Sequence, residues 1–282
     1  MKLIRAMNHA RITARRGRKR SNLRGDLAVL AIMKNESTNL DEWMSHYFAV
    51  GADRIVLIDN GSTDDTFEKA KLWVAKGNVD LISLPERYKQ TQHYWDAASR
   101  FILRKYEWLL IADLDEFWFC PDAKSLPAKL AEPDFATVDV IYANWRMFGS
   151  SGLVEHPPSI RRMLVHCDPK LGAHVNTKYM CRTSVLKSRR NIQVHRVAGA
   201  NSARTISDNE NFRLFHYPIQ SLRFFETTKM TRGDVLGAAS DQVRDLDYFK
   251  QYDAPCTCVD RTLADLIDRG ELGNIRPVTA PD

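Results

Sequence analysis

From residue 26 onward, short continuous apolar runs alternate with stretches whose hydrophobic positions recur at helical spacing. The continuous runs predict buried strands, and they cover residues 27–33, 54–58, 79–84 and 108–112. The helical spacing predicts helices over residues 40–51, 67–76 and 91–105. Strands that alternate with helices in this way indicate βαβ units and a mostly parallel sheet.

Local signals support the first helix and the turn that follows the second strand. Asn39, with Glu42 three residues later, resembles a capping box, and Gly51 is suited to close the helix. The polar turn 59–66 is able to cap the next helix.

The second half of the chain is less regular. Strands are predicted at 137–142, 179–183, 192–197 and 212–216, and helices at 221–232 and 262–269. Loops rich in Pro, Gly and Ser separate them. We therefore expect a regular, nucleotide-binding type of half and an irregular half that shapes the site of a second substrate.

Composition indicates an ordinary globular chain with a basic start. The 282 residues are 44% hydrophobic, which is enough for a sizeable core. Residues 1–25 hold nine Lys and Arg and no acid, so the net charge of +6 comes from this segment. Such a segment is a solvated extension or contacts an anionic membrane surface, and nucleic acid is the least favoured partner.

Two further features bear on the compartment. No apolar run approaches the length of about 20 residues needed to cross a membrane, and the N-terminus lacks the apolar core of a signal peptide. The five cysteines lack the spacing of a zinc site, which favours reduced thiols. We expect a cytoplasmic protein, either free or peripheral at the inner face of the membrane through its basic segment.

The candidate chemistry begins at the end of the fourth predicted strand, in Asp113-Leu114-Asp115. Carboxylates at a buried strand end can be solvated surface acids, or they can bind Mg²⁺ or Mn²⁺. Polar turns also follow the first and second strands, at 34–36 and 59–62. The carboxyl ends of parallel strands lie at one edge of a sheet, so these turns should converge there on a ligand. No glycine-rich phosphate loop is present, so a metal would have to neutralise a bound diphosphate.

Together these residues resemble the family 2 and family 92 glycosyltransferases over about residues 27–235. The residues that carry the resemblance occur in order along the chain: Lys34-Asn35-Glu36, Glu42-Trp43, His46, Gly51, the segment 58–66, Gln92, the segment 108–117, the segment 145–152, Lys178, His195, His216-Tyr217, Ser221, Phe225, Lys229 and Gly233.

The resemblance implies a GT-A fold, an α/β Rossmann-like architecture with a mostly parallel central sheet flanked by helices and an irregular acceptor-side half. It divides the chain into a basic extension (1–25), a GT-A domain (26–235) and a C-terminal helical extension packed on that domain (236–282). It also implies that Asp59 contacts the nucleoside, Asp113 the ribose or a metal-bound water, and Asp115 the metal.

Other positions are weaker candidates for the same site. Lys34, Glu36, Asn60, Arg87 and Gln92 are expected near the nucleotide. The two histidines at apolar strand ends, His195 and His216, could complete the metal shell or could be satisfied core histidines. Lys178 and Lys229 could neutralise the leaving diphosphate or could be ordinary exposed lysines. Glu155 and Asp208 are candidates for the general base, although each could be a surface acid.

The function implied is an inverting glycosyl transfer that depends on Mn²⁺ or Mg²⁺. A hexose would move from a nucleotide diphosphate sugar, UDP-linked by default, to a hydroxyl of a glycan or lipid-linked acceptor. Two alternatives stay open from the sequence. One is a phosphatase of the haloacid dehalogenase type with Asp113 as nucleophile, and the other is a non-catalytic protein that binds nucleotide sugars.

Overall fold

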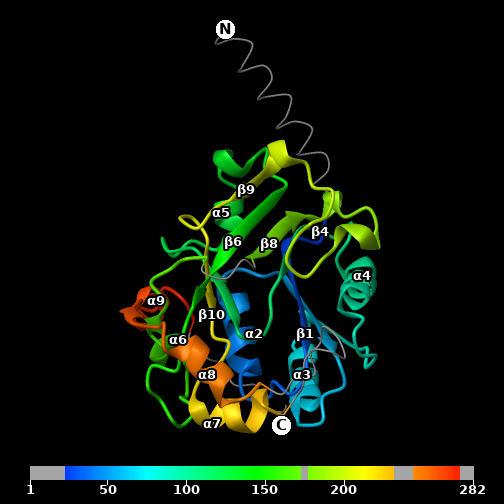
Figure 1. Ribbon diagram of the computed structural model, residues 1–282. Coiled ribbons are helices and arrows are strands. Elements are labelled where there is room, and N and C mark those ends of the chain that lie inside the picture. Colours follow the sequence, from blue (N-terminus) through cyan, green and yellow to red (C-terminus); the bar gives the residue numbers. More distant parts are fainter. Residues whose placement is uncertain (1–22, 173–176, 232–243, 274–282) are drawn as a thin grey trace.

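A curled central sheet carries most of the fold (Figure 1). The computed structural model describes residues 23–172, 177–231 and 244–273. Within them the sheet has nine strands in the order β3-β2-β1-β4-β8-β6-β10-β5, with β9 beside β6. Its strands are β1 (Gly25–Met33), β2 (Arg54–Asp59), β3 (Val79–Ser83), β4 (Tyr106–Ile111), β5 (Glu116–Phe119), β6 (Val140–Met147), β8 (Thr177–Arg182), β9 (Thr205–Ser207) and β10 (Arg213–His216). A separate pair joins β7 (His166–Cys167) to β11 (Cys258–Val259).

Short helices surround this sheet. The α-helices are α2 (Leu40–Ala49), α3 (Thr66–Val74), α4 (Gln90–Phe101), α5 (Leu126–Leu130), α6 (Ile160–Met163), α7 (Leu222–Phe224), α8 (Leu246–Asp253) and α9 (Thr262–Asp268). Single 3₁₀ turns lie at Pro133–Phe135, Thr183–Val185, Arg189–Asn191 and Ser202–Arg204, and a π-helical turn spans Phe225–Lys229.

The predicted α/β fold class is confirmed. Strands β3, β2, β1 and β4 are parallel to one another, as the alternation of strands and helices predicted. Strand β8 runs antiparallel to β4 and to β6, and β5 runs antiparallel to β10, whereas β10 and β9 are parallel to β6. The regular half is thus the parallel part of the sheet, and the irregular half supplies its mixed part.

Strand β1 shows why the strands of the regular half appear in the sequence as continuous apolar runs. Its residues Leu27, Val29 and Ala31 belong to one core, together with residues of α2 and α3. Ala28 and Leu30, which point to the other face, belong to a second core with α4. Because both faces are covered, a central parallel strand needs apolar side chains at every position.

Three local features differ from what the sequence led us to expect. Segment 192–197 is not a strand of the sheet, because Ile192 and Val197 pair with each other across a tight turn. The short strand β5 was not predicted, since its four residues follow directly on the acidic turn. The side chain of Asn39 does not cap α2, and the Glu42 carboxylate accepts hydrogen bonds from Ser159 and from the backbone at the start of α6.

The C-terminal region lies against the rest of the chain. Leu263, Leu266 and Ile267 of α9 join the core that contains α2, and Phe249 of α8 packs with Ile219 and Phe225 in a small separate cluster. The expected basic segment 1–25 lies almost wholly outside the described residues. Among the residues that the structure describes, no helix combines the length and apolarity needed to span a bilayer.

Candidate functional site

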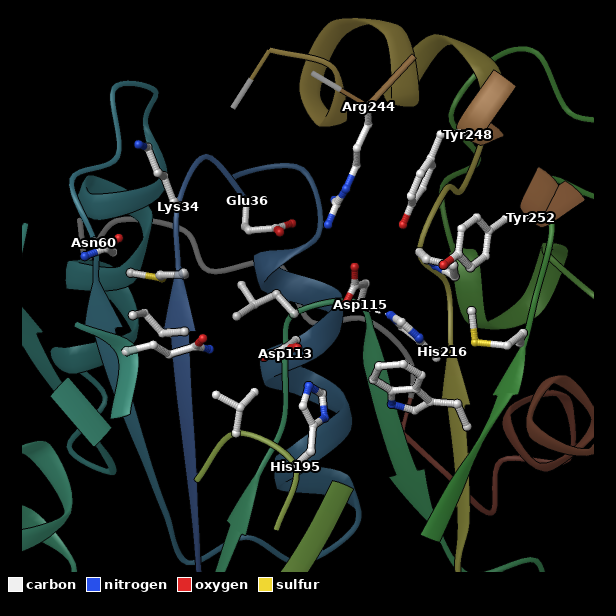
Figure 2. A pocket seen from close by; sticks show the side chains of 18 of the residues that line it. Lys34, Glu36, Asn60, Asp113, Asp115, His195, His216, Arg244, Tyr248 and Tyr252 are labelled. Carbon is white, nitrogen blue, oxygen red and sulfur yellow. Dashed lines mark ion pairs between the residues drawn. The ribbon is translucent and has the colours of Figure 1, made fainter. Parts of the chain in front are cut away.

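A cavity of about 270 Å³ opens at the carboxyl ends of the parallel strands. Figure 2 shows Lys34 and Asn60 on one side of it, His216, Tyr248 and Tyr252 on the other, and Glu36, Asp113 and Asp115 between them. Parallel pairing brings the strand ends together, since Asn60 donates its backbone N–H to Met33 and Ala112 donates to Leu30. The predicted convergence of the three polar turns is therefore observed, although Asp59 of the second turn does not line the cavity.

The pairing of β5 with β10 places Asp115 beside His216. His216 lies opposite Glu116 in this antiparallel pair, and Tyr217 donates its backbone N–H to the Asp115 carbonyl at 2.9 Å. As a result, His216 Nε2 is 3.5 Å from Asp115 Oδ1. The indole of Trp145, on β6, packs against the imidazole with ring centroids 4.4 Å apart. The strand register thus fixes both side chains at the cavity floor.

Lys178 lies behind Asp113 and is fully buried. Its Nζ is 2.9 Å from Asp113 Oδ2 and 3.7 Å from Glu116 Oε2. Burial alone would lower the pKa of Lys178, but the negative charges of Asp113 and Glu116 outweigh it and raise that pKa above its ordinary value. The lysine therefore stays charged, and it holds the first carboxylate of the acidic motif in place.

Glu116 shares this buried position. Burial raises the pKa of Glu116 well above its ordinary value, with Lys178 opposing the shift and Asp113 and Asp115 adding to it. Its carboxyl accepts hydrogen bonds from Trp145 Nε1 at 2.8 Å and from the Asp113 backbone N–H at 2.9 Å. Glu116 thereby fixes the turn that presents the two aspartates.

A second buried lysine, Lys229, holds Asp115. Its Nζ is 2.6 Å from Asp115 Oδ2 and 4.0 Å from Glu36 Oε1. Lys229 is the last residue of the π-helical turn, where Met230 donates its backbone N–H to the Phe225 carbonyl. Such wide turns occur often at functional sites because they redirect one side chain.

The far wall of the cavity comes from the C-terminal helix α8. Arg244, Tyr248 and Tyr252 line the cavity from that side (Figure 2). The helix is tied to the sheet through Asp253, whose Oδ1 accepts the Ser150 backbone N–H at 2.6 Å. The resemblance found in the sequence ended before α8, so none of these residues was predicted. The two tyrosines at i and i+4 spacing were the signal that could have indicated a shared face.

Eight of the predicted site residues line the cavity: Lys34, Glu36, Asn60, Arg87, Asp113, Asp115, His195 and His216. Asp59 and Gln92 do not. The Asp59 carboxylate accepts the backbone N–H groups of Gly61 and Ser62 and so orders its own turn. The Gln92 side chain accepts a hydrogen bond from Arg189 outside the cavity. Gln90, two residues earlier, lines the cavity instead.

The two candidate bases do not line this cavity. Glu155 is 73% exposed and pairs with Arg223, and Asp208 accepts the backbone N–H groups of Glu210 and Asn211 in a loop. Both are used locally, which is the alternative that the sequence left open for each.

His195 lines the cavity, but its hydrogen-bond partner is a backbone carbonyl and not the Asp115–His216 pair. Its Nδ1 donates to the Thr177 carbonyl at 3.0 Å. Burial, followed by the positive charge of Lys178, lowers the pKa of His195. Among the described residues, no group of three or more His, Cys, Asp or Glu is arranged to hold a metal ion. A metal at this site would therefore need ligands from its substrate or from water.

Comparison with known proteins assigns the family. Residues 30–245 match the model of glycosyltransferase family 92. The Glycosyltransferase family 92 protein At1g27200 of Arabidopsis thaliana is 27% identical over 158 residues, which are 49% of this chain and 26% of that protein. The chain thus spans about a quarter of the length of this curated relative.

Two solved structures show distant likeness. S. aureus TarS 1–349 in complex with UDP-GlcNAc has a TM-score of 0.45 at 15% identity, covering 68% of this chain and 58% of that one. Glucosyl-3-phosphoglycerate synthase from Mycobacterium tuberculosis, with Mn²⁺, UDP-glucose and phosphoglyceric acid, has a TM-score of 0.36 at 18% identity, covering 57% and 58%. The family match overturns the phosphatase alternative, in which Asp113 was a nucleophile. With most of its length matched to the family model, the chain belongs to glycosyltransferase family 92.

Proposed function

We propose that the protein transfers a hexose from a nucleotide diphosphate sugar, UDP-linked by default, to a hydroxyl group of a glycan or lipid-linked acceptor, with inversion and with Mn²⁺ or Mg²⁺. One observation carries this proposal. The acidic pair Asp113 and Asp115 faces the polar side chains of Lys34, Asn60 and Arg87 across one cavity at the ends of the parallel strands. Ligands of open parallel sheets bind in this place.

The residues present fit a divalent cation. The acidic motif and its neighbours contribute four carboxyl groups, those of Glu36, Asp113, Asp115 and Glu116. Two buried ammonium groups, those of Lys178 and Lys229, pair with them. Asp115 Oδ1 and His216 Nε2 are 3.5 Å apart. Neighbouring ligands of an octahedral ion at the Mg²⁺ distance are about 3 Å apart, so a small movement would let both bind one ion.

Asp115 and His216 would hold the ion, and oxygens of the substrate and water would complete its shell, as Mg²⁺ and Mn²⁺ commonly allow. When bound, the ion would neutralise the departing diphosphate. The chain's own residues prepare the site. Lys178 orients Asp113, and Trp145 packs on His216 and limits the motion of its ring. Lys34 and Arg87 line the cavity from the nucleotide side and add positive charge for the phosphates.

The test is a screen of nucleotide sugars for release of nucleoside diphosphate, with Mn²⁺ or Mg²⁺ present. We expect turnover with one UDP-sugar, and we expect UDP with Mn²⁺ to raise the melting temperature. Replacing Asp115 with Asn should abolish metal-dependent UDP binding. Asp122→Asn is the matched control, because Asp122 also pairs with a lysine but lies away from the cavity. Indifference of the melting temperature to every nucleoside diphosphate would overturn the proposal.

Binding of UDP and Mn²⁺ without any turnover would favour the non-catalytic alternative. Contact of the basic N-terminal segment with an anionic membrane, and a cytoplasmic location, stay predictions. Sedimentation with anionic vesicles, with and without residues 1–24, tests the first of them.

A further inference from the structure

We propose that Lys229 acts as an internal counter-ion that competes with the divalent metal for Asp115, so that metal and nucleotide bind together and neither binds well alone. This inference rests on the proposed function, because it concerns the same metal and donor. It goes beyond it by assigning to Lys229 control over the order and the coupling of binding.

The first step is the position of Lys229. Its side chain is fully buried, and its Nζ lies 2.6 Å from Asp115 Oδ2. The other oxygen of Asp115 faces His216. The donor-free protein therefore already neutralises the carboxylate that would bind the metal, and it does so with a charge that water does not screen.

The second step is repulsion between the two cations. A metal ion on Asp115 and an ammonium group on the same carboxylate would lie within about 5 Å of each other, and like charges at that range in a buried site repel strongly. Lys229 must then move or the metal must bind weakly. A lysine has a flexible four-carbon stem and is suited to such a movement.

The third step is an alternative anionic partner for the Lys229 ammonium group. Glu36 Oε1, from the loop after β1, is 4.0 Å from Nζ, and Glu36 lines the cavity. A diphosphate bound between the acidic motif and the loop after β1 would offer a further anionic partner. The nucleotide would thus draw Lys229 off Asp115 and favour metal binding, and the metal would in turn favour the nucleotide.

The experiment measures the binding of Mn²⁺ directly, from the paramagnetic resonance signal of the free ion, with the full chain and with or without UDP. In the unaltered protein, UDP should tighten Mn²⁺ binding by at least about tenfold. In Lys229→Gln, whose amide can still donate to Asp115 without a charge, Mn²⁺ alone should bind at least about tenfold tighter than in the unaltered protein. The gain from UDP should shrink correspondingly.

Lys129→Gln is the matched control. Lys129 is also buried and pairs with Asp122 at 2.6 Å, but Asp122, unlike Asp115, does not line the cavity. Its replacement should leave Mn²⁺ binding unchanged, and a change equal to that of Lys229→Gln would overturn the proposal.

Three other results are decisive. If Lys229→Gln binds Mn²⁺ alone no tighter than the unaltered protein, Lys229 does not compete and the inference is wrong. If that variant does not fold, by circular dichroism, the unaltered protein decides, since equal Mn²⁺ affinity with and without UDP overturns the inference. If UDP does not bind at all with Mn²⁺, the proposed function itself fails, which is a separate outcome.

Discussion

Replacing Lys178 with Met should destabilise the protein by about 3 kcal/mol. Breaking a buried ion pair by removing one partner costs about 3–5 kcal/mol, because the remaining charge stays buried without compensation. The lower value applies here, since the side chain of Asp113 is 35% exposed and water screens part of its charge, whereas Glu116 is fully buried. For a chain of this size, the loss corresponds to a drop in melting temperature of about 6–10 °C.

Urea unfolding followed by tryptophan fluorescence measures this loss, with Lys250→Met as a surface control that should change stability by less than about 0.5 kcal/mol. The double variant Lys178→Met with Glu116→Gln also removes the fully buried acid and leaves only the partly exposed Asp113 without its lysine, so it should recover at least about half of the loss. A loss below about 1 kcal/mol in the single variant would refute the reasoning. A double variant as unstable as the sum of its single variants would also refute it, because no coupling would then exist between Lys178 and Glu116.

Three further predictions concern the pH dependence of stability, the attachment of α8, and the two acids that were candidates for the general base. Burial, and then the positive charge of Arg161, lower the pKa of His46 well below its ordinary value. The unfolded chain therefore binds a proton more readily than the folded protein, and the free energy of unfolding should fall as pH drops below about 6.5. His46→Gln should flatten this dependence in urea titrations from pH 7 to pH 5. Gly149→Ala places a Cβ 2.6 Å from Asp253 Oδ1, so amide hydrogen exchange in α8 should accelerate while that of β1 stays unchanged. Glu155→Gln and Asp208→Asn should each keep glycosyl transfer within about twofold of the unaltered rate, and a loss above about a hundredfold in either would restore it as a candidate base.

The regular half of the fold could be predicted because burial on both faces of a strand leaves a pattern within a short stretch of sequence. A strand such as β1, covered on both faces, must be apolar throughout, and that pattern is visible in the sequence. Segment 192–197 shows the limit of the same criterion. Its apolar residues Ile192 and Val197 are buried in the core beside α4 from a tight turn, and burial alone does not distinguish a strand from such a turn.

The candidate site could be predicted as a set of residue types but not as a set of partners. His195 and His216 both stand near strand ends in the sequence, and only the register of β5 against β10 puts His216 beside Asp115. The sequence left Lys178 and Lys229 as partners of a diphosphate or as exposed lysines, and the structure buries both and pairs them with Asp113 and Asp115. Such pairings depend on contacts between residues more than 60 positions apart, which no local pattern reveals.

The attachment of α8 has a consequence for how substrate choice can change. This helix supplies Tyr248 and Tyr252 to the cavity, yet both lie beyond the part of the chain that matches the family model. It packs mainly on a small cluster of its own, with Phe249 against Phe225, and Tyr252 also packs against the main core. Substitutions in α8 can therefore remodel one wall of the cavity while the strand ends that carry the acidic motif keep their geometry. For directed evolution, a library in α8 would vary this wall of the cavity without changing the acidic motif itself.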